Sequence, residues 1–174
     1  MTIDDKFKEL VESDTGCVVI LAGSGSDRPH IEKIAAGLEV YGIPYEVRVF
    51  SAHKQSQQVP FIIGEYDKLN GALGYIFVAG GSDALSGTGS FCSYRPGVSC
   101  PPDNPNESCL TNPPGSSNAY IARPENVGRF FAQMFSYLNE TYRDKLATEM
   151  TKKREKLKAD DDKLRREFAA RQGR

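Results

Sequence analysis

The chain has 174 residues, of which 39% are hydrophobic and 26% are charged, and this composition excludes disordered and membrane proteins. The formal net charge of -1 excludes the strongly basic surface typical of nucleic-acid-binding proteins, so we expect no nucleic-acid partner. Residues 17–22 are too short an apolar run to span a bilayer, and residues 1–14 do not resemble a signal peptide, so we expect a cytoplasmic protein without a membrane partner.

Strand, loop and helix alternate along the first half of the chain. Short apolar runs with β-branched residues predict buried strands, and apolar residues at helical spacing, such as Ile31, Ile34 and Leu38, predict the helices between them. The predicted strands are residues 17–21, 45–50, 75–79 and 98–100, and the predicted helices are residues 1–14, 31–41 and 59–70. This alternation predicts a parallel sheet with right-handed crossovers, and so a flavodoxin- or Rossmann-like α/β fold, a three-layer α/β/α sandwich.

Beyond the predicted sheet, residues 101–115 are rich in proline, asparagine and serine, which favours a lid or a loop that contacts a partner. Pro124 predicts the start of another helix, because a proline at a helix start leaves no N–H unpaired. The buried side of this helix is expected to comprise Val127, Phe130, Phe131, Met134, Phe135 and Leu138.

Charged residues dominate after Asn139, so we assign residues 1–139 to an α/β catalytic domain and residues 140–174 to a helical arm or tail. A thin apolar stripe favours an arm laid across a neighbouring subunit as far as Leu157, and a solvated, fraying tail beyond it. The alternative is a solvated tail throughout.

Polar loops follow the first three predicted strands, at the sheet edge where parallel α/β folds bind ligands. In the first loop, Gly23, Ser24 and Ser26 offer backbone N–H and hydroxyl donors that suit a phosphate. Asp27 can accept hydrogen bonds from ribose hydroxyls. A tight turn with Asp27 as the N-cap of the next helix explains the same residues without a ligand, and the local pattern leaves both interpretations open.

His53 follows the second strand, and small residues, Ser51 and Ala52, precede it and leave room for a ligand. A histidine at this edge can transfer protons near neutral pH, and Lys54 beside it can pair with a phosphate. The alternative is a surface histidine at a helix start. Convergence with the first loop favours the catalytic interpretation for His53, whereas His30 is expected to be a surface or packing residue.

Gly80, Gly81, Ser82 and Asp83 form the third loop, whose backbone N–H groups can hold a carboxylate or carbon dioxide. Ser82 or Asp83 can equally cap the following helix, and both roles are compatible. Cys100 and Cys109 have no spacing that provides a base for a nucleophile, so we interpret them as small apolar residues. 

These loops, in this order, resemble the aminoimidazole ribonucleotide carboxylase (PurE) family of purine biosynthesis, over about residues 18–138. Gly23-Ser24 with Ser26-Asp27 is similar to its first signature, and residues 41–54, Tyr-Gly-Ile-Pro-Tyr-Glu-Val-Arg-Val-Phe-Ser-Ala-His-Lys, are similar to its second. Lys54 and the run Ser99-Cys100-Pro101-Pro102 resemble class II members, which use carbon dioxide directly.

The resemblance implies a homo-octamer with an imidazole ribonucleotide bound between subunits, and no metal or organic cofactor. It implies that His53 transfers the proton at the imidazole C4. Ser24, Ser26, Asp27, Ser51 and Lys54 would hold ribose and phosphate, and the loop from Gly80 to Leu85 would hold the carboxylate or carbon dioxide. The full expected substrate-binding set is Gly23, Ser24, Ser26, Asp27, Ser51, Ala52, Lys54, Gly80, Gly81, Ser82, Asp83 and Leu85.

The chain departs from the family pattern where class II chains usually read Ala-Gly-Arg-Ser-Asn, because Gly81 and Asp83 replace the arginine and the asparagine. Thr111 stands where a second arginine is expected. An Asp83 carboxylate that points inward would favour expulsion of carbon dioxide over its capture. The expected activity is therefore a carboxy-lyase at C4, with a possible bias toward decarboxylation. The alternatives are the class I mutase, a decarboxylase of a related imidazole, and a non-catalytic nucleotide-binding homologue.

Overall fold

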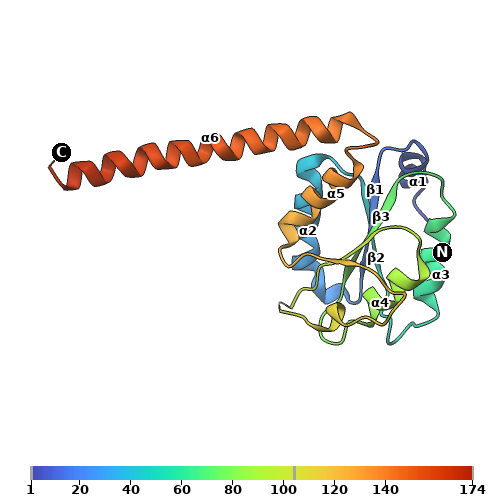
Figure 1. Ribbon diagram of the computed structural model, residues 1–174. Coiled ribbons are helices and arrows are strands. Elements are labelled where there is room, and N and C mark those ends of the chain that lie inside the picture. The colour runs from blue at the N-terminus through green and yellow to red at the C-terminus, as the bar shows by residue number, and fades with distance from the viewer. Residues whose placement is uncertain (1, 104, 174) are drawn as a thin grey trace.

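In the computed structural model, which describes residues 2–103 and 105–173, the chain forms a three-layer α/β/α domain from which one long helix extends (Figure 1). Five parallel strands form the sheet in the order β2-β1-β3-β4-β5. The strands are β1 (Cys17–Ala22), β2 (Tyr45–Val49), β3 (Leu73–Val78), β4 (Gly97–Ser99) and β5 (Ala119–Tyr120). The predicted fold class is confirmed, and β5 is an addition to the four predicted strands.

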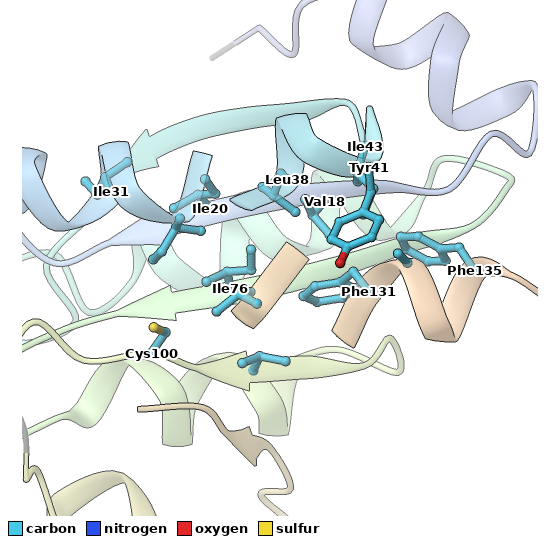
Figure 2. Packing of buried hydrophobic residues seen from close by; sticks show 14 of the residues in the cluster. Val18, Ile20, Ile31, Leu38, Tyr41, Ile43, Ile76, Cys100, Phe131 and Phe135 are labelled. Atoms are coloured by element: carbon cyan, nitrogen blue, oxygen red, sulfur yellow. The ribbon is translucent and has the colours of Figure 1, made fainter. Parts of the chain in front are cut away.

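The two central strands, β1 and β3, are buried along their whole length, because helices cover both faces of the sheet. Successive side chains of β1 point to opposite faces, so Val18 and Ile20 belong to one core and Val19 and Leu21 to the other. The first core lies under α2 (Arg28–Tyr41) and α5 (Val127–Phe135), as Figure 2 shows. The second lies under α1 (Asp5–Glu12), α3 (Gln58–Asp67) and α4 (Ala84–Cys92).

Short 3-10 turns complete the domain at Gly25–Asp27, Ser108–Leu110 and Pro124–Asn126. The helix predicted from Pro124 therefore begins with a 3-10 turn and becomes α-helical at Val127. Leu138, which was expected on its buried side, is 59% exposed because α5 ends at Phe135. The predicted N-terminal helix is α1; Met1, where that prediction began, lies outside the described residues.

The last helix, α6 (Glu140–Arg171), is attached to the domain by its first two turns. Tyr142 donates a hydrogen bond from its hydroxyl to the Gly16 carbonyl at 3.0 Å, and Lys145 donates one to the Tyr41 carbonyl at 2.9 Å. Tyr142 and Leu146 are its buried residues, and the remainder projects from the domain in Figure 1.

The fraying predicted beyond Leu157 is wrong, since α6 continues to Arg171, although Leu164 and Phe168 are exposed as in a solvated tail. Residues with high helix propensity, mainly alanine, leucine, lysine, glutamate and arginine, fill most of this segment. Ion pairs one turn apart add to this, for example Lys152 with Glu149 at 2.7 Å and Arg165 with Asp162 at 3.4 Å. In the described part of the chain, no helix is long and apolar enough to cross a membrane.

Candidate active site

The strand order reverses direction between β1 and β3, and in parallel α/β sheets this position opens a crevice at the carboxyl ends of the strands. A pocket of about 290 Å³ lies there. Its walls come from the loops after β1, β2 and β3, which are the three loops singled out in the sequence. The lining residues are Gly23, Ser24, Asp27, Ser51, Ala52, His53, Ala79, Gly80, Ser82, Ala84 and Leu85.

The structure thus brings together most of the predicted site residues, including His53. Four of them do not line the pocket: Ser26, Lys54, Gly81 and Asp83. Ala79 and Ala84 line the pocket but were not predicted. Both are small residues next to predicted site residues, and nothing else in the sequence indicates that they line a pocket.

In the first loop, a serine rather than the aspartate caps the turn. Ser24 is in extended conformation and its hydroxyl accepts a hydrogen bond from the Ser26 amide at 3.2 Å. The hydroxyls of Ser24 and Ser26 are 2.7 Å apart. Asp27 immediately precedes α2, but its side chain makes no capping hydrogen bond. Asp27 also lines the pocket, which favours its ligand-binding interpretation.

The Asp27 carboxylate lies in an environment that disfavours its charge. Partial burial raises the pKa of Asp27, the positive charge of His30 acts in the opposite direction, and the nearby Asp103 carboxylate raises it further. A hydrogen-bond donor that approached from the pocket would stabilise the charged form.

The loop after β2 presents His53 to the pocket through a turn that its own side chains hold. Ser51 accepts a hydrogen bond from the Lys54 amide at 3.3 Å, and the Ser51 amide donates one to the Gln55 side-chain oxygen at 3.3 Å. The His53 side chain is exposed on the pocket wall. Lys54 faces a neighbouring hollow with residues 55–58, so it lies beside the pocket rather than in it.

In the third loop, Asp83 caps α4. Its Oδ1 accepts a hydrogen bond from the Ser86 amide at 2.9 Å, and the residue is only 3% exposed. Burial raises the pKa of this carboxyl, while hydrogen bonds from Ser86 and Leu85 act in the opposite direction. The capping interpretation of Asp83 is therefore the one that the structure supports, and Asp83 is not the negative charge on the pocket wall.

A different aspartate, missed in the sequence, lies against this loop. Asp103 accepts a hydrogen bond from the Gly81 amide through its Oδ2, at 2.7 Å. Gly81 has a φ of +65°, a left-handed conformation that favours glycine and that directs its amide toward Asp103. Asp103 stands in a proline- and asparagine-rich segment, and no local pattern indicates a contact with a residue 22 positions earlier.

His30 and two of the cysteines have packing roles. The His30 Nε2 lies 3.0 Å from the Cys100 carbonyl and 3.4 Å from its thiol. Burial raises the pKa of the Cys100 thiol to about 12, so it is protonated near neutral pH. Cys109 is also buried. These features agree with the interpretation of Cys100 and Cys109 as small apolar residues.

Comparison with known proteins identifies the family. A family model described as AIR carboxylase matches residues 17–156. The chain belongs to the AIR carboxylase family.

The similarity extends over most of the chain. A relative from Treponema denticola named phosphoribosylaminoimidazole carboxylase is 36% identical over 155 residues, which cover 86% of this chain and 98% of that protein. The crystal structure of Treponema denticola PurE superposes with a TM-score of 0.80 at 35% identity, with 86% of this chain and 98% of that chain covered. A mouse bifunctional phosphoribosylaminoimidazole carboxylase/phosphoribosylaminoimidazole succinocarboxamide synthetase is 35% identical over 94% of this chain and 40% of its own length. The AIR carboxylase fold and the family expected from the sequence are thereby confirmed.

Proposed function

We propose that this chain catalyses the reversible carboxylation of aminoimidazole ribonucleotide at C4, with carbon dioxide as the second substrate. The observation that carries the proposal is the position of His53. In a chain of the AIR carboxylase family, this histidine lies on the wall of a pocket at the switch point of the sheet, together with Ser24, Asp27 and Gly80. A proton-transfer group, ribose acceptors and a glycine turn therefore share one pocket.

The substrate is oriented by groups on the first two loops. The Asp27 carboxylate accepts hydrogen bonds from ribose hydroxyls, and Ser24 and Ser51 donate hydrogen bonds from their hydroxyls. Lys54, beside the pocket, attracts the phosphate. In this proposal the imidazole lies near His53 and the Gly80 turn, where its C4 meets carbon dioxide.

In the carboxylating direction, the amino-substituted ring attacks carbon dioxide through C4 and a C–C bond forms. His53 then takes the proton from C4, and the ring recovers its aromatic electrons. In the reverse direction, the His53 imidazolium protonates C4, the C–C bond breaks and carbon dioxide leaves. No metal or organic cofactor takes part in this scheme, a prediction that metal analysis of the active protein tests.

Self-association is part of the proposal. The described pocket residues include no lysine or arginine, although a ribonucleotide phosphate carries close to two negative charges. We propose that a neighbouring subunit in a homo-octamer adds the missing cation. The exposed apolar residues of α6, among them Leu157 and Leu164, provide a surface for such a neighbour. A cytoplasmic location fits this proposal.

An ultraviolet assay of the purified protein tests the function. Carboxyaminoimidazole ribonucleotide, its N-carboxylated isomer and aminoimidazole ribonucleotide with bicarbonate are supplied as substrates in separate reactions. Turnover in both directions is the expected result. Turnover of the N-carboxylated nucleotide alone would indicate the mutase instead, which the class II features Lys54 and Ser99-Cys100-Pro101-Pro102 oppose. Silence with every substrate would contradict the proposal and favour another imidazole or a binding role.

A further inference from the structure

The glycine turn expected to receive a substrate carboxylate already binds a carboxylate from the chain itself. Asp103 accepts the hydrogen bond of the Gly81 amide at 2.7 Å. The carboxylate also lies against Gly80, which lines the pocket, because a β-carbon on Gly80 would be 3.2 Å from Asp103 Oδ1. Asp103 therefore contacts the turn whose Gly80 forms part of the pocket wall.

Other contacts fix Asp103 in this position. The Asn106 side-chain amide donates to Asp103 Oδ1 at 2.9 Å and to the Gly81 carbonyl at 3.1 Å, and Asn106 is only 5% exposed. The Asp83 amide donates to the Ser108 hydroxyl at 2.8 Å. The segment around Asp103 is thus joined to the third loop by several hydrogen bonds, and the carboxylate is a built part of the site.

The charge of Asp103 extends its influence into the pocket. Slight desolvation raises the pKa of the exposed Asp103, but the hydrogen bonds from Gly81 and Asn106 outweigh it and lower the pKa overall, so the group is ionised at neutral pH. Burial is the main cause that raises the pKa of Asp27 in the first loop, and the charge of Asp103 raises it further. A substrate carboxylate that binds near this turn is repelled by the negative charge of Asp103.

We propose that Asp103 is a specificity-determining residue, which holds the Gly81 amide outside the pocket and, through its negative charge, makes the pocket prefer the uncarboxylated imidazole. The inference rests on the proposed function, since it assigns a carboxylated and an uncarboxylated imidazole to one pocket. Asp103 weakens binding of the carboxylated imidazole relative to the uncarboxylated one, and so destabilises the bound carboxylated state. The equilibrium constant of the carboxylation reaction is unchanged. Only the relative affinities for the two nucleotides differ.

Equilibrium binding of both nucleotides tests this preference. In the His53→Asn background, which is expected to bind without turnover, titration calorimetry measures the Kd of aminoimidazole ribonucleotide and of its C4-carboxylated form. Addition of Asp103→Asn keeps an oxygen acceptor for Gly81 and removes the charge. The Kd of the carboxylated nucleotide is expected to fall about tenfold, as for one nearby charge in a partly solvated site, with little change for the other.

Glu107→Gln is the matched control, because it removes one negative charge from an exposed position in the same segment. It is expected to change neither Kd. An equal change for both nucleotides in the Asp103→Asn protein, or the same change in the Glu107→Gln protein, would overturn the assignment.

A second measurement needs no nucleotide, so it separates this inference from the proposed function. The amide resonance of Gly81 is followed by NMR in glycine-labelled protein during addition of sodium bicarbonate. Asp103→Ala frees the Gly81 amide, so bicarbonate is expected to shift this resonance in the variant and to leave it unmoved in the wild type. If the variant shows no shift, the turn does not receive carboxylates and the inference is wrong, whatever the assay of turnover gives.

Discussion

Gly128 of α5 faces Gly37 of α2 so closely that a β-carbon on Gly128 would lie 1.9 Å from the Gly37 carbonyl oxygen. Gly37 is also closely packed, since a β-carbon on it would lie 2.9 Å from the carbonyl of Glu125, in the turn before α5. The two helices therefore pack backbone against backbone. This contact positions α2, whose first turn follows the pocket loop that carries Ser24 and Asp27.

Replacement of Gly128 by alanine is expected to lower the free energy of unfolding by about 2–3 kcal/mol, because the added methyl group forces the helices apart. The matched control is Gly64→Ala in α3, where a β-carbon meets no atom of the described residues within 4 Å. Alanine there should raise stability by about 0.5–1 kcal/mol through helix propensity. Urea denaturation measures both changes, and equal values would contradict the close contact.

Replacement of His53 by asparagine is expected to abolish turnover and keep the fold. The side chain is exposed, so its loss leaves no cavity. Removal of a positioned acid or base lowers kcat by about 10²–10⁴-fold. The assay is paired with thermal unfolding and with exchange of the C4 proton in heavy water. A variant that exchanges this proton at the wild-type rate would remove His53 from the mechanism.

Asp83→Asn is expected to stabilise the protein at neutral pH. Asparagine caps a helix as well as aspartate does, and it removes the charge on the buried Oδ2, which has no hydrogen-bond partner among the described residues. Because burial raises the pKa of Asp83, the wild type is most favoured when this group is protonated and loses stability as pH rises through its folded-state pKa.

The gain from Asp83→Asn should therefore be about 1 kcal/mol at pH 7 and should shrink toward pH 4, near the pKa of an unfolded aspartate. Thermal unfolding across this pH range measures it. Asp4, the N-cap of α1, accepts the Phe7 amide at 2.9 Å from an exposed position, so Asp4→Asn is the matched control. A gain of equal size at both positions would show that burial of Asp83 is not the cause.

The double variant Leu157→Glu and Leu164→Glu is expected to reduce the number of subunits in the assembly. Both leucines are exposed on one stripe of α6, at 69% and 53%, and their burial against a neighbour would be lost. Sedimentation velocity measures the change. Ala159→Glu with Arg166→Glu, on the opposite face of the same helix, is the control and should leave the assembly intact. An unchanged assembly in the leucine variant would exclude this stripe as the interface.

The sequence was sufficient for the fold class because its strong signals are local. The apolar strands, the helical spacing of Ile31, Ile34 and Leu38, and Gly42 at a helix end each report on a few neighbouring residues. Their order then restricts the topology. The family and the three pocket loops followed from the same local motifs, and the family is confirmed.

What escaped prediction depends on contacts between distant segments. Strand β5 has only two residues, too few for any periodicity, and it exists because Ala119 pairs with Val98. The capping role of Asp83 and the contact of Asp103 with Gly81 both depend on how one loop lies on another. The continuous helix beyond Leu157 is explained by helix propensity summed over many residues, a signal that the thin apolar stripe does not carry.

The loop that carries Asp103 runs between two buried thiols, Cys100 and Cys109, whereas Cys92 lies exposed on α4. A thiol reagent should therefore react at once with Cys92 and reach the other two only when this loop lifts away from the domain. The alkylation rates of Cys100 and Cys109, followed by mass spectrometry, therefore measure how often the loop opens. A ligand that displaces Asp103 should raise both rates.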